Sequence, residues 1–186
     1  RTNLFGRIAA TRSFMASYRS DAPGVIPHAL QALEYLPEQD ITWRGAAAIA
    51  LGDAYVYQGQ YAEAERTYLE ALETISATGN TYLWMNVSLK MALVVKSQGR
   101  LQQVIEICQQ RLQLGQESGM SQTEMAGWLL AIWGEVLAEL DDLDGALRRV
   151  NQGVELTEQG KDVAMLTWSY LCLTRVLFSR SELTAA

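Results

Sequence analysis

Apolar residues recur along the sequence at intervals of three and four, in blocks of about 14 to 20 residues. This spacing is typical of amphipathic α-helices, whereas the strict alternation of a β-strand is rare here. Short polar breaks such as "PEQD", "QGQ", "QGR" and "EQGK" separate the blocks. The pattern predicts an all-α protein. The predicted helices span about 3–18, 24–36, 41–58, 61–77, 81–98, 101–117, 121–140, 143–159 and 162–179.

The helices repeat in pairs with a period of about 40 residues. Aligned turn positions fall at Ser20, Gly59, Gly99 and Asp141, which are 39, 40 and 42 residues apart. Seven residues before each turn stands a small residue, namely Ser13, Gly52, Ala92 and Gly134. Five residues after each turn stands a small or β-branched residue, namely Val25, Ala64, Val104 and Ala146. Each unit is therefore predicted to be two helices joined by a tight turn.

The small residues indicate where the two helices of a pair approach each other. We expect Gly52 and Ala64 to lie at such a contact, with Leu51, Tyr55 and Tyr68 filling the space around it. A single helix pair cannot bury its apolar face, so the units must stack on one another. The prediction is one domain over residues 1–186, a right-handed α–α superhelix of four helical hairpins plus one further helix. The predicted units are about 3–36, 41–77, 81–117 and 121–159, with a partial unit at 162–179.

The second unit resembles the tetratricopeptide (TPR) pattern, and the other units match it more loosely. The matching residues are Leu51, Gly52, Tyr55, Gly59, Ala64, Tyr68 and Ala71. The long period and the segment "ALEYLPEQDITWRGAAAIALGDAYVYQGQYAEAE" (residues 32–65) are similar to one TPR-like family in particular. They resemble the helical-repeat sensor region of MalT-like, ATP-dependent transcriptional regulators of the LuxR family.

In that family a nucleotide-binding module precedes the repeats and a LuxR-type helix-turn-helix domain follows them. The resemblance implies that this chain is a cytoplasmic sensing region taken from a longer regulator. No GxxxxGK[ST] phosphate loop occurs in the sequence, so no cofactor is expected in this segment. ATP is expected only in the upstream module of the parent protein.

Composition and charge limit the classes of partner that this segment is expected to bind. The net charge of −6 and pI of about 4.8 argue against direct binding of nucleic acid by this segment. No apolar run approaches the roughly 18 residues that a membrane helix needs, so no membrane contact is expected. Cys108 and Cys172 lack the spacing of metal ligands, which predicts reduced thiols in the core of a cytoplasmic protein.

Catalytic chemistry is not indicated. The only histidine, His28, has no second histidine to pair with. The carboxylates of Asp141, Asp142 and Asp144 lie at a predicted helix start, where they complement the helix dipole. We therefore predict no catalytic residue, no metal site and no enzyme activity.

The first helix of each pair is expected to line the concave face of the superhelix. The candidate groove residues on these helices are Asp53, Tyr57, Asn86, Lys90, Trp128, Glu135, Trp168 and Arg175. Lys96 and Glu139 occupy inward-facing positions as well. Trp128 and Trp168 share one repeat position, which leaves two interpretations. The indoles either form a platform for a sugar or a peptide, or pack as core between repeats.

The sequence is consistent with two functions. In the first, a small-molecule effector or a protein or peptide binds the concave face and changes contacts with the other modules of the regulator. In the second, the chain is a stand-alone TPR adaptor that grips an extended peptide of a partner protein. The open ends of a stack of repeats also expose apolar surface, through which self-association is expected to be possible.

Overall fold

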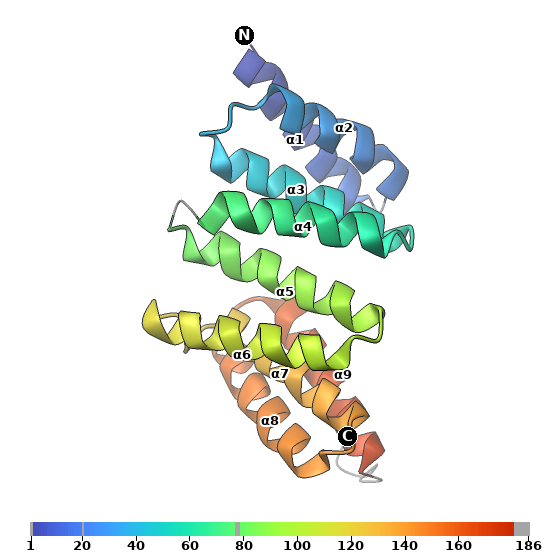
Figure 1. Ribbon diagram of the computed structural model, residues 1–186, viewed down its shortest axis with the longest axis vertical. Helices are drawn as coiled ribbons and strands as arrows, with labels where there is room; N and C mark the ends of the chain where they lie inside the picture. The colour runs from blue at the N-terminus through green and yellow to red at the C-terminus, as the bar shows by residue number, and fades with distance from the viewer. Residues whose placement is uncertain (1, 20, 77–78, 181–186) are drawn as a thin grey trace. The chain divides into compact units, whose positions relative to one another are not determined.

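The computed structural model describes residues 2–19, 21–76 and 79–180, and within these residues every regular element is an α-helix. Nine helices lie in this part of the chain, as predicted (Figure 1). They are α1 (Thr2–Tyr18), α2 (Ala22–Tyr35), α3 (Ile41–Tyr57), α4 (Tyr61–Ser76), α5 (Thr81–Ser97), α6 (Leu101–Glu117), α7 (Glu124–Glu139), α8 (Leu143–Gln159) and α9 (Val163–Ser179). The all-α class is confirmed. The predicted last residue of the fourth helix, 77, lies outside the described residues.

Helix starts differ from the prediction where a capping side chain decides them. The α2 helix begins at Ala22 rather than at residue 24, because the side chain of Asp21 accepts a hydrogen bond from the amide of Gly24. Pro27 therefore lies inside the helix. The α7 helix begins three residues later than predicted, because the Thr123 hydroxyl accepts from the amide of Ala126.

The turns inside three hairpins share one backbone geometry. Gly59, Gly99 and Asp141 adopt positive φ angles of 72°, 73° and 65°. The residue after each turn donates its amide to the carbonyl of the residue five positions earlier: Gln60 to Tyr55, Arg100 to Val95 and Asp142 to Leu137. This is the hydrogen bond of a Schellman motif, which ends a helix and reverses the chain. The fourth aligned turn position, Ser20, lies outside the described residues.

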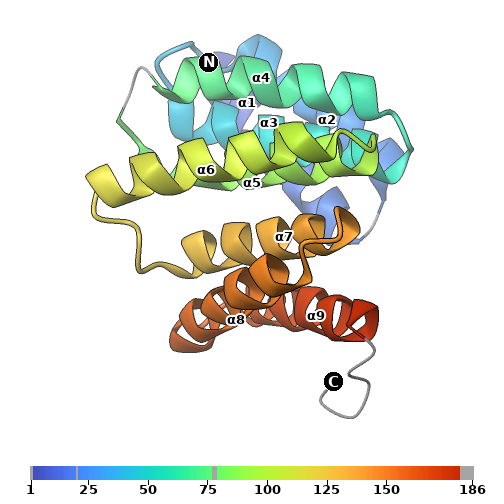
Figure 2. The same cartoon turned by 60° about the horizontal axis from the view of Figure 1, so that its bottom comes forward.

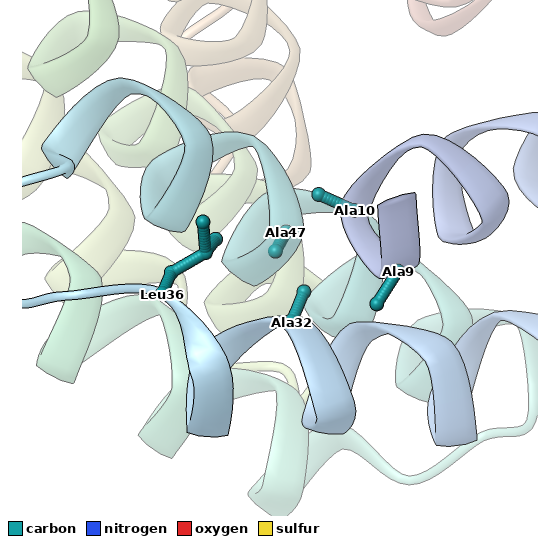
Figure 3. Close-up of a cluster of buried hydrophobic side chains, with 5 residues drawn as sticks. All are labelled: Ala9, Ala10, Ala32, Leu36 and Ala47. Carbon is teal, nitrogen blue, oxygen red and sulfur yellow. The ribbon is translucent and has the colours of Figure 1, made fainter. Parts of the chain in front are cut away.

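The chain divides into two compact units, residues 1–94 and residues 95–186, with the boundary inside α5. In the first unit α1 packs against α2 and α3, α2 against α3, and α3 against α4. One core cluster, drawn in Figure 3, joins the first three helices through small side chains. Its members are Ala9, Ala10, Ala32, Leu36 and Ala47. The alanines allow these helices to pack closely, while Leu36 fills the space that they leave.

In the second unit α7 packs against α6, α8 and α9, and Figure 2 shows α7, α8 and α9 lying against one another. The α7 and α8 backbones meet at glycine. A Cβ on Gly134 would lie 2.8 Å from the Ala146 carbonyl oxygen, and one on Gly127 would lie 2.7 Å from the Gly153 carbonyl oxygen. Only glycine fits at such a distance between two helices. The prediction of one domain and one superhelix over residues 1–186 stays a prediction.

The repeat positions are confirmed by burial. The small residues at 13, 52, 92 and 134 are all buried, and so are the residues at 25, 64, 104 and 146. The expectation that Tyr68 fills the space at Gly52 is confirmed. Its ring is the nearest group and lies 2.2 Å from where a Cβ of Gly52 would stand. The ring reaches across the hairpin because Gly52 leaves room for it.

Substituting Gly134 tests the backbone contact. Gly134→Ala should lower the free energy of unfolding by about 2 kcal/mol, because its Cβ can be accommodated only if α8 moves away. The matched control is Gly45→Ala in α3, where the Cβ would meet only the flexible side chain of the partly buried Leu83 and no backbone atom. The control should be neutral or stabilising by up to about 1 kcal/mol. Urea unfolding followed by circular dichroism measures both, and equal effects would contradict the backbone contact.

Asp141 provides a second test, because it holds a conformation that favours glycine. Asp141→Gly should be more stable than Asp141→Ala by about 1 kcal/mol, since only the alanine variant carries a Cβ into the left-handed region. The same comparison at an exposed position inside a helix gives the opposite order. Thermal unfolding of the two variants checks the sign, and a more stable alanine variant would rule out strain at this turn.

Candidate functional site

The eight predicted groove residues lie two on each of α3, α5, α7 and α9, which are the first helices of three hairpins and the single helix that follows them. The structure brings six of them together in three direct pairs. These pairs are Asp53 with Lys90, Glu135 with Arg175, and Trp128 with Trp168. Each pair joins side chains about one repeat apart, so the first helices of neighbouring hairpins are linked through these residues.

In the first unit Asp53 is the centre of a small polar group. Its Oδ2 lies 3.0 Å from Nζ of Lys90, and its Oδ1 accepts a hydrogen bond of 2.7 Å from the hydroxyl of Tyr68. Burial and the neighbouring Asp53 carboxylate both raise the pKa of Tyr68 far above its usual range. The phenol therefore stays protonated and remains a donor to Asp53. This group ties α3 to both α4 and α5.

The remaining two candidates in the first unit, Asn86 and Tyr57, do not form one of the three direct pairs between candidate residues. Asn86 lies one helical turn before Lys90 on α5 and is half-buried. Tyr57 is the last residue of α3 and is 78% exposed. Both are accessible to a molecule that approaches α3 or α5.

In the second unit Glu135 has three partners although its side chain is only 7% exposed. Its Oε1 lies 2.8 Å from Nζ of Lys96 and also pairs with Arg175, and its Oε2 accepts from the thiol of Cys172 at 3.3 Å. Burial alone would raise the pKa of Glu135, but hydrogen bonds from Lys96, Arg175 and Cys172, together with the charge of Lys96, hold it below its usual value. Lys96 also contacts Glu139 at 3.2 Å.

The two tryptophans are stacked, with ring centroids 6.2 Å apart and planes inclined by 26°. Trp128 is 7% exposed and packs as a core residue, whereas Trp168 is 40% exposed. The indole nitrogen of Trp128 is buried and has no hydrogen-bond partner among the described residues. The interpretation as a core residue therefore fits Trp128. That Trp168 forms a platform for a ligand stays a prediction.

Two polar contacts were not predicted from the sequence. Tyr68 was assigned to packing, because its position follows the apolar pattern of α4, and only its hydroxyl distinguishes it from a phenylalanine there. The thiol contact of Cys172 had no signal in the sequence. That both Cys108 and Cys172 are free and buried agrees with the prediction of core thiols.

The carboxylates at the start of α8 have structural partners. The side chain of Asp142 accepts from the amide of Gly145 at 2.9 Å, and Asp144 pairs with Arg180 at 2.7 Å. The interpretation of these residues as helix-start groups is confirmed for Asp142. No cluster of three or more histidine, cysteine or acidic side chains suited to a metal ion occurs in the described part of the chain. None of the helices described is both long and apolar enough to span a membrane.

Comparison with known families now adds to this geometry. The family model of the MalT-like TPR region matches residues 6–186. The chain belongs to the MalT-like TPR family. The resemblance inferred from residues 32–65 and from the repeat period is confirmed over nearly the whole chain. None of the curated proteins compared with the sequence matches it.

Solved structures place the MalT-like TPR region among TPR-like helical-repeat folds. BtubC (BKLC) from P. vanneervenii is 16% identical with a TM-score of 0.72, and the match covers 92% of this chain and 71% of that one. Aspartyl phosphate phosphatase F from Bacillus subtilis is 14% identical with a TM-score of 0.80, over 98% of this chain and 48% of that one. The chain thus spans about half of that phosphatase. At these identities the likeness shows the fold alone.

A third similar structure is the putative kinesin light chain of Podosopora anserina, with nearly identical TPR-like repeats. It is 13% identical with a TM-score of 0.70, and the match covers 100% of this chain and 90% of that one. The predicted fold class is therefore confirmed as all-α and TPR-like.

The buried carboxylate of the MalT-like TPR region makes its stability depend on pH. Because the pKa of Glu135 is lowered in the folded state, its contribution is complete above about pH 4.3 and is lost as the pH falls through the lower folded value. Glu135→Gln should lower the free energy of unfolding by about 2 kcal/mol at pH 7. The stability of this variant should also depend less on pH between about 5 and 3. Hydrogen exchange of α7 and α9, measured by mass spectrometry, reports both effects.

The control is Glu139→Gln, the same chemical change at a carboxylate that also contacts Lys96 but is 46% exposed. Its effect at pH 7 should stay below about 0.5 kcal/mol. Similar losses of protection in the two variants would show that burial of Glu135 is unimportant.

Proposed function

We propose that this MalT-like TPR region is the effector-sensing or protein-interaction part of an ATP-dependent LuxR-family transcriptional regulator. The observation that carries the proposal is the family match over residues 6–186. The ligand, a small-molecule effector or a protein or peptide, binds on the face formed by the first helices of the hairpins. The region itself is non-catalytic and cytoplasmic, binds neither nucleic acid nor membrane, and needs no cofactor, since ATP belongs to an upstream module.

The chemistry of α7 and α9 supports this choice of face. Trp168 presents a partly exposed indole stacked on Trp128, which gives it a fixed orientation. Arg175 lies seven residues further on the same side of α9, about 10 Å along the helix, and half of its side chain is exposed. A flat apolar ring with hydrogen-bond donors beside it suits a sugar or a peptide.

The ion pairs offer a way to transmit binding. Glu135 and Arg175 link α7 to α9, and Arg175 is the exposed member of the pair. A ligand acceptor that bonds to Arg175 competes with Glu135 and loosens the link between the two helices. Binding then favours one of two arrangements of the second unit, and contacts with the other modules of the regulator follow that choice.

The adaptor alternative is less well supported. It depends on the mixed polar and basic side of the groove formed by Asn86, Lys90 and Lys96, which would have to be free to bind a peptide. Lys90 is paired with Asp53, and Lys96 is paired with Glu135 and Glu139. A peptide carboxylate would have to displace these partners, so we favour sensing over an adaptor role.

Trp168→Ala tests the proposed face. Neutral oligosaccharides and extended peptides are screened by tryptophan fluorescence, and affinities are then measured by calorimetry. Trp168→Ala should weaken a ligand found in this way by about tenfold or more, because it removes the exposed stacking surface. The control is Tyr170→Ala, a similarly exposed aromatic residue on the opposite side of α9 that bonds to Glu158. Its affinity should change by less than about twofold.

The full parent regulator then provides the functional readout. An effector of the sensing region should change nucleotide exchange and self-association of the parent, and Trp168→Ala should remove both responses. A ligand that binds but changes neither would contradict the sensing role. A sequence-specific peptide preference without such responses would support the adaptor instead.

A further inference from the structure

A cleft in the first unit lies away from all eight candidate groove residues. It is formed by α2, α3 and α4 and has a volume of about 160 Å³. Its apolar lining is provided by Leu30, Leu33, Ile41, Ala48, Leu51, Tyr55, Ala71 and Ile75. Ala48 carries only a methyl group, which leaves space open along α3.

One end of the cleft holds a guanidinium group that is fixed from behind. A terminal nitrogen of Arg44, Nη1, donates to the carbonyl oxygens of Leu33 at 2.6 Å and of Leu36 at 2.8 Å. These carbonyls lie at the end of α2, so Arg44 also caps that helix. Its Nε and Nη2 are not engaged by any of the described residues. A half-buried arginine held in this way presents a prepared fork for a carboxylate.

The other end of the cleft is polar and more exposed. Because α3 and α4 are antiparallel, with Gly52 against Tyr68, the side chains of Arg66 and Thr67 lie toward Tyr55 and far from Arg44. Arg66 pairs with Glu70 at 4.0 Å, and both side chains are more than 70% exposed. Such a pair is weak and easily displaced, so this end forms an open rim.

We propose that this cleft is a second ligand site, for a small carboxylic acid with an apolar body. The carboxylate binds Arg44 bidentately, and the body lies over Ala48 between α2 and α4. The volume resembles that of a cavity of about 150 Å³ that takes up benzene, so the body is a single ring or a chain of about six carbons. The site is independent of the proposed function on the first helices.

The lining favours an acid with an apolar body over other ligand classes. A sugar could bond to the polar side chains of Thr67, Glu70 and Thr74. It would also place hydroxyl groups against Leu33, Leu51 and Ile75, and each hydroxyl left without a partner there costs free energy. A hydrocarbon would fill the space but leave the prepared guanidinium unused. A free phosphate would satisfy Arg44 but gain nothing from the apolar lining.

Calorimetry on the whole chain tests the site with benzoate, phenylacetate and hexanoate, each compared with its neutral amide. At least one acid should bind saturably, and its amide should bind about tenfold more weakly or not at all. Ala48→Leu fills the cleft without touching the backbone bonds of Arg44, and should weaken the acid by about tenfold or more. Arg66→Gln, at the rim, is the control and should change the affinity by less than about threefold.

Arg44→Lys keeps the positive charge but loses the two parallel donors of the guanidinium, so it should weaken binding of the acid as well. Arg44→Lys also disturbs the end of α2. If this variant fails to fold, Ala48→Leu alone tests the proposal. The proposal is overturned if acids and amides bind alike, if Ala48→Leu has no effect, or if no acid binds up to about 10 mM. Trp168→Ala should leave acid binding unchanged. Failure of this proposal can therefore be distinguished from failure of the proposed function.

Discussion

Tight closure of the three hairpins whose turns the structure describes is the constraint on which this fold depends. Gly59, Gly99 and Asp141 turn the chain through the left-handed region, and the same hydrogen bond of the following residue ends the first helix each time. Seven residues earlier a small residue lets the second helix, or a ring from it, come close. The turn and the small residue must act together, because a tight turn forces the helices together whether or not there is room for side chains between them.

Closure of the hairpins in turn orients the first helices toward one another. Asp53 reaches Lys90, and Glu135 reaches Arg175, across one repeat. These contacts stabilise neighbouring first helices, so the charged residues of the candidate face have structural partners before any ligand arrives. In the function that we propose, a ligand on this face would act by competing for these partners rather than by meeting free charges. Sensing would then consist of a change in which side chains pair.

The cleft and the candidate face use the same scaffold in different ways. The first helices face each other through polar and aromatic side chains, whereas the cleft opens where α2 and α4 flank α3. The small residues of α3 serve both purposes. Gly52 admits the ring of Tyr68, whose hydroxyl bonds to Asp53, and Ala48 leaves space in the cleft that Arg44 also lines.

The amino-acid sequence by itself determined the helices, their pairing and the family, because periodicity, turn residues and small residues are local signals that each repeat carries again. It also placed the candidate residues on the first helices. Only the tertiary structure decided that Trp128 is buried while Trp168 is exposed, that Tyr68 bonds to Asp53, and that Arg44 closes one end of a cleft. These outcomes depend on the distance between residues from different helices. A helical period fixes the direction of a side chain but not the length of the gap that it must cross.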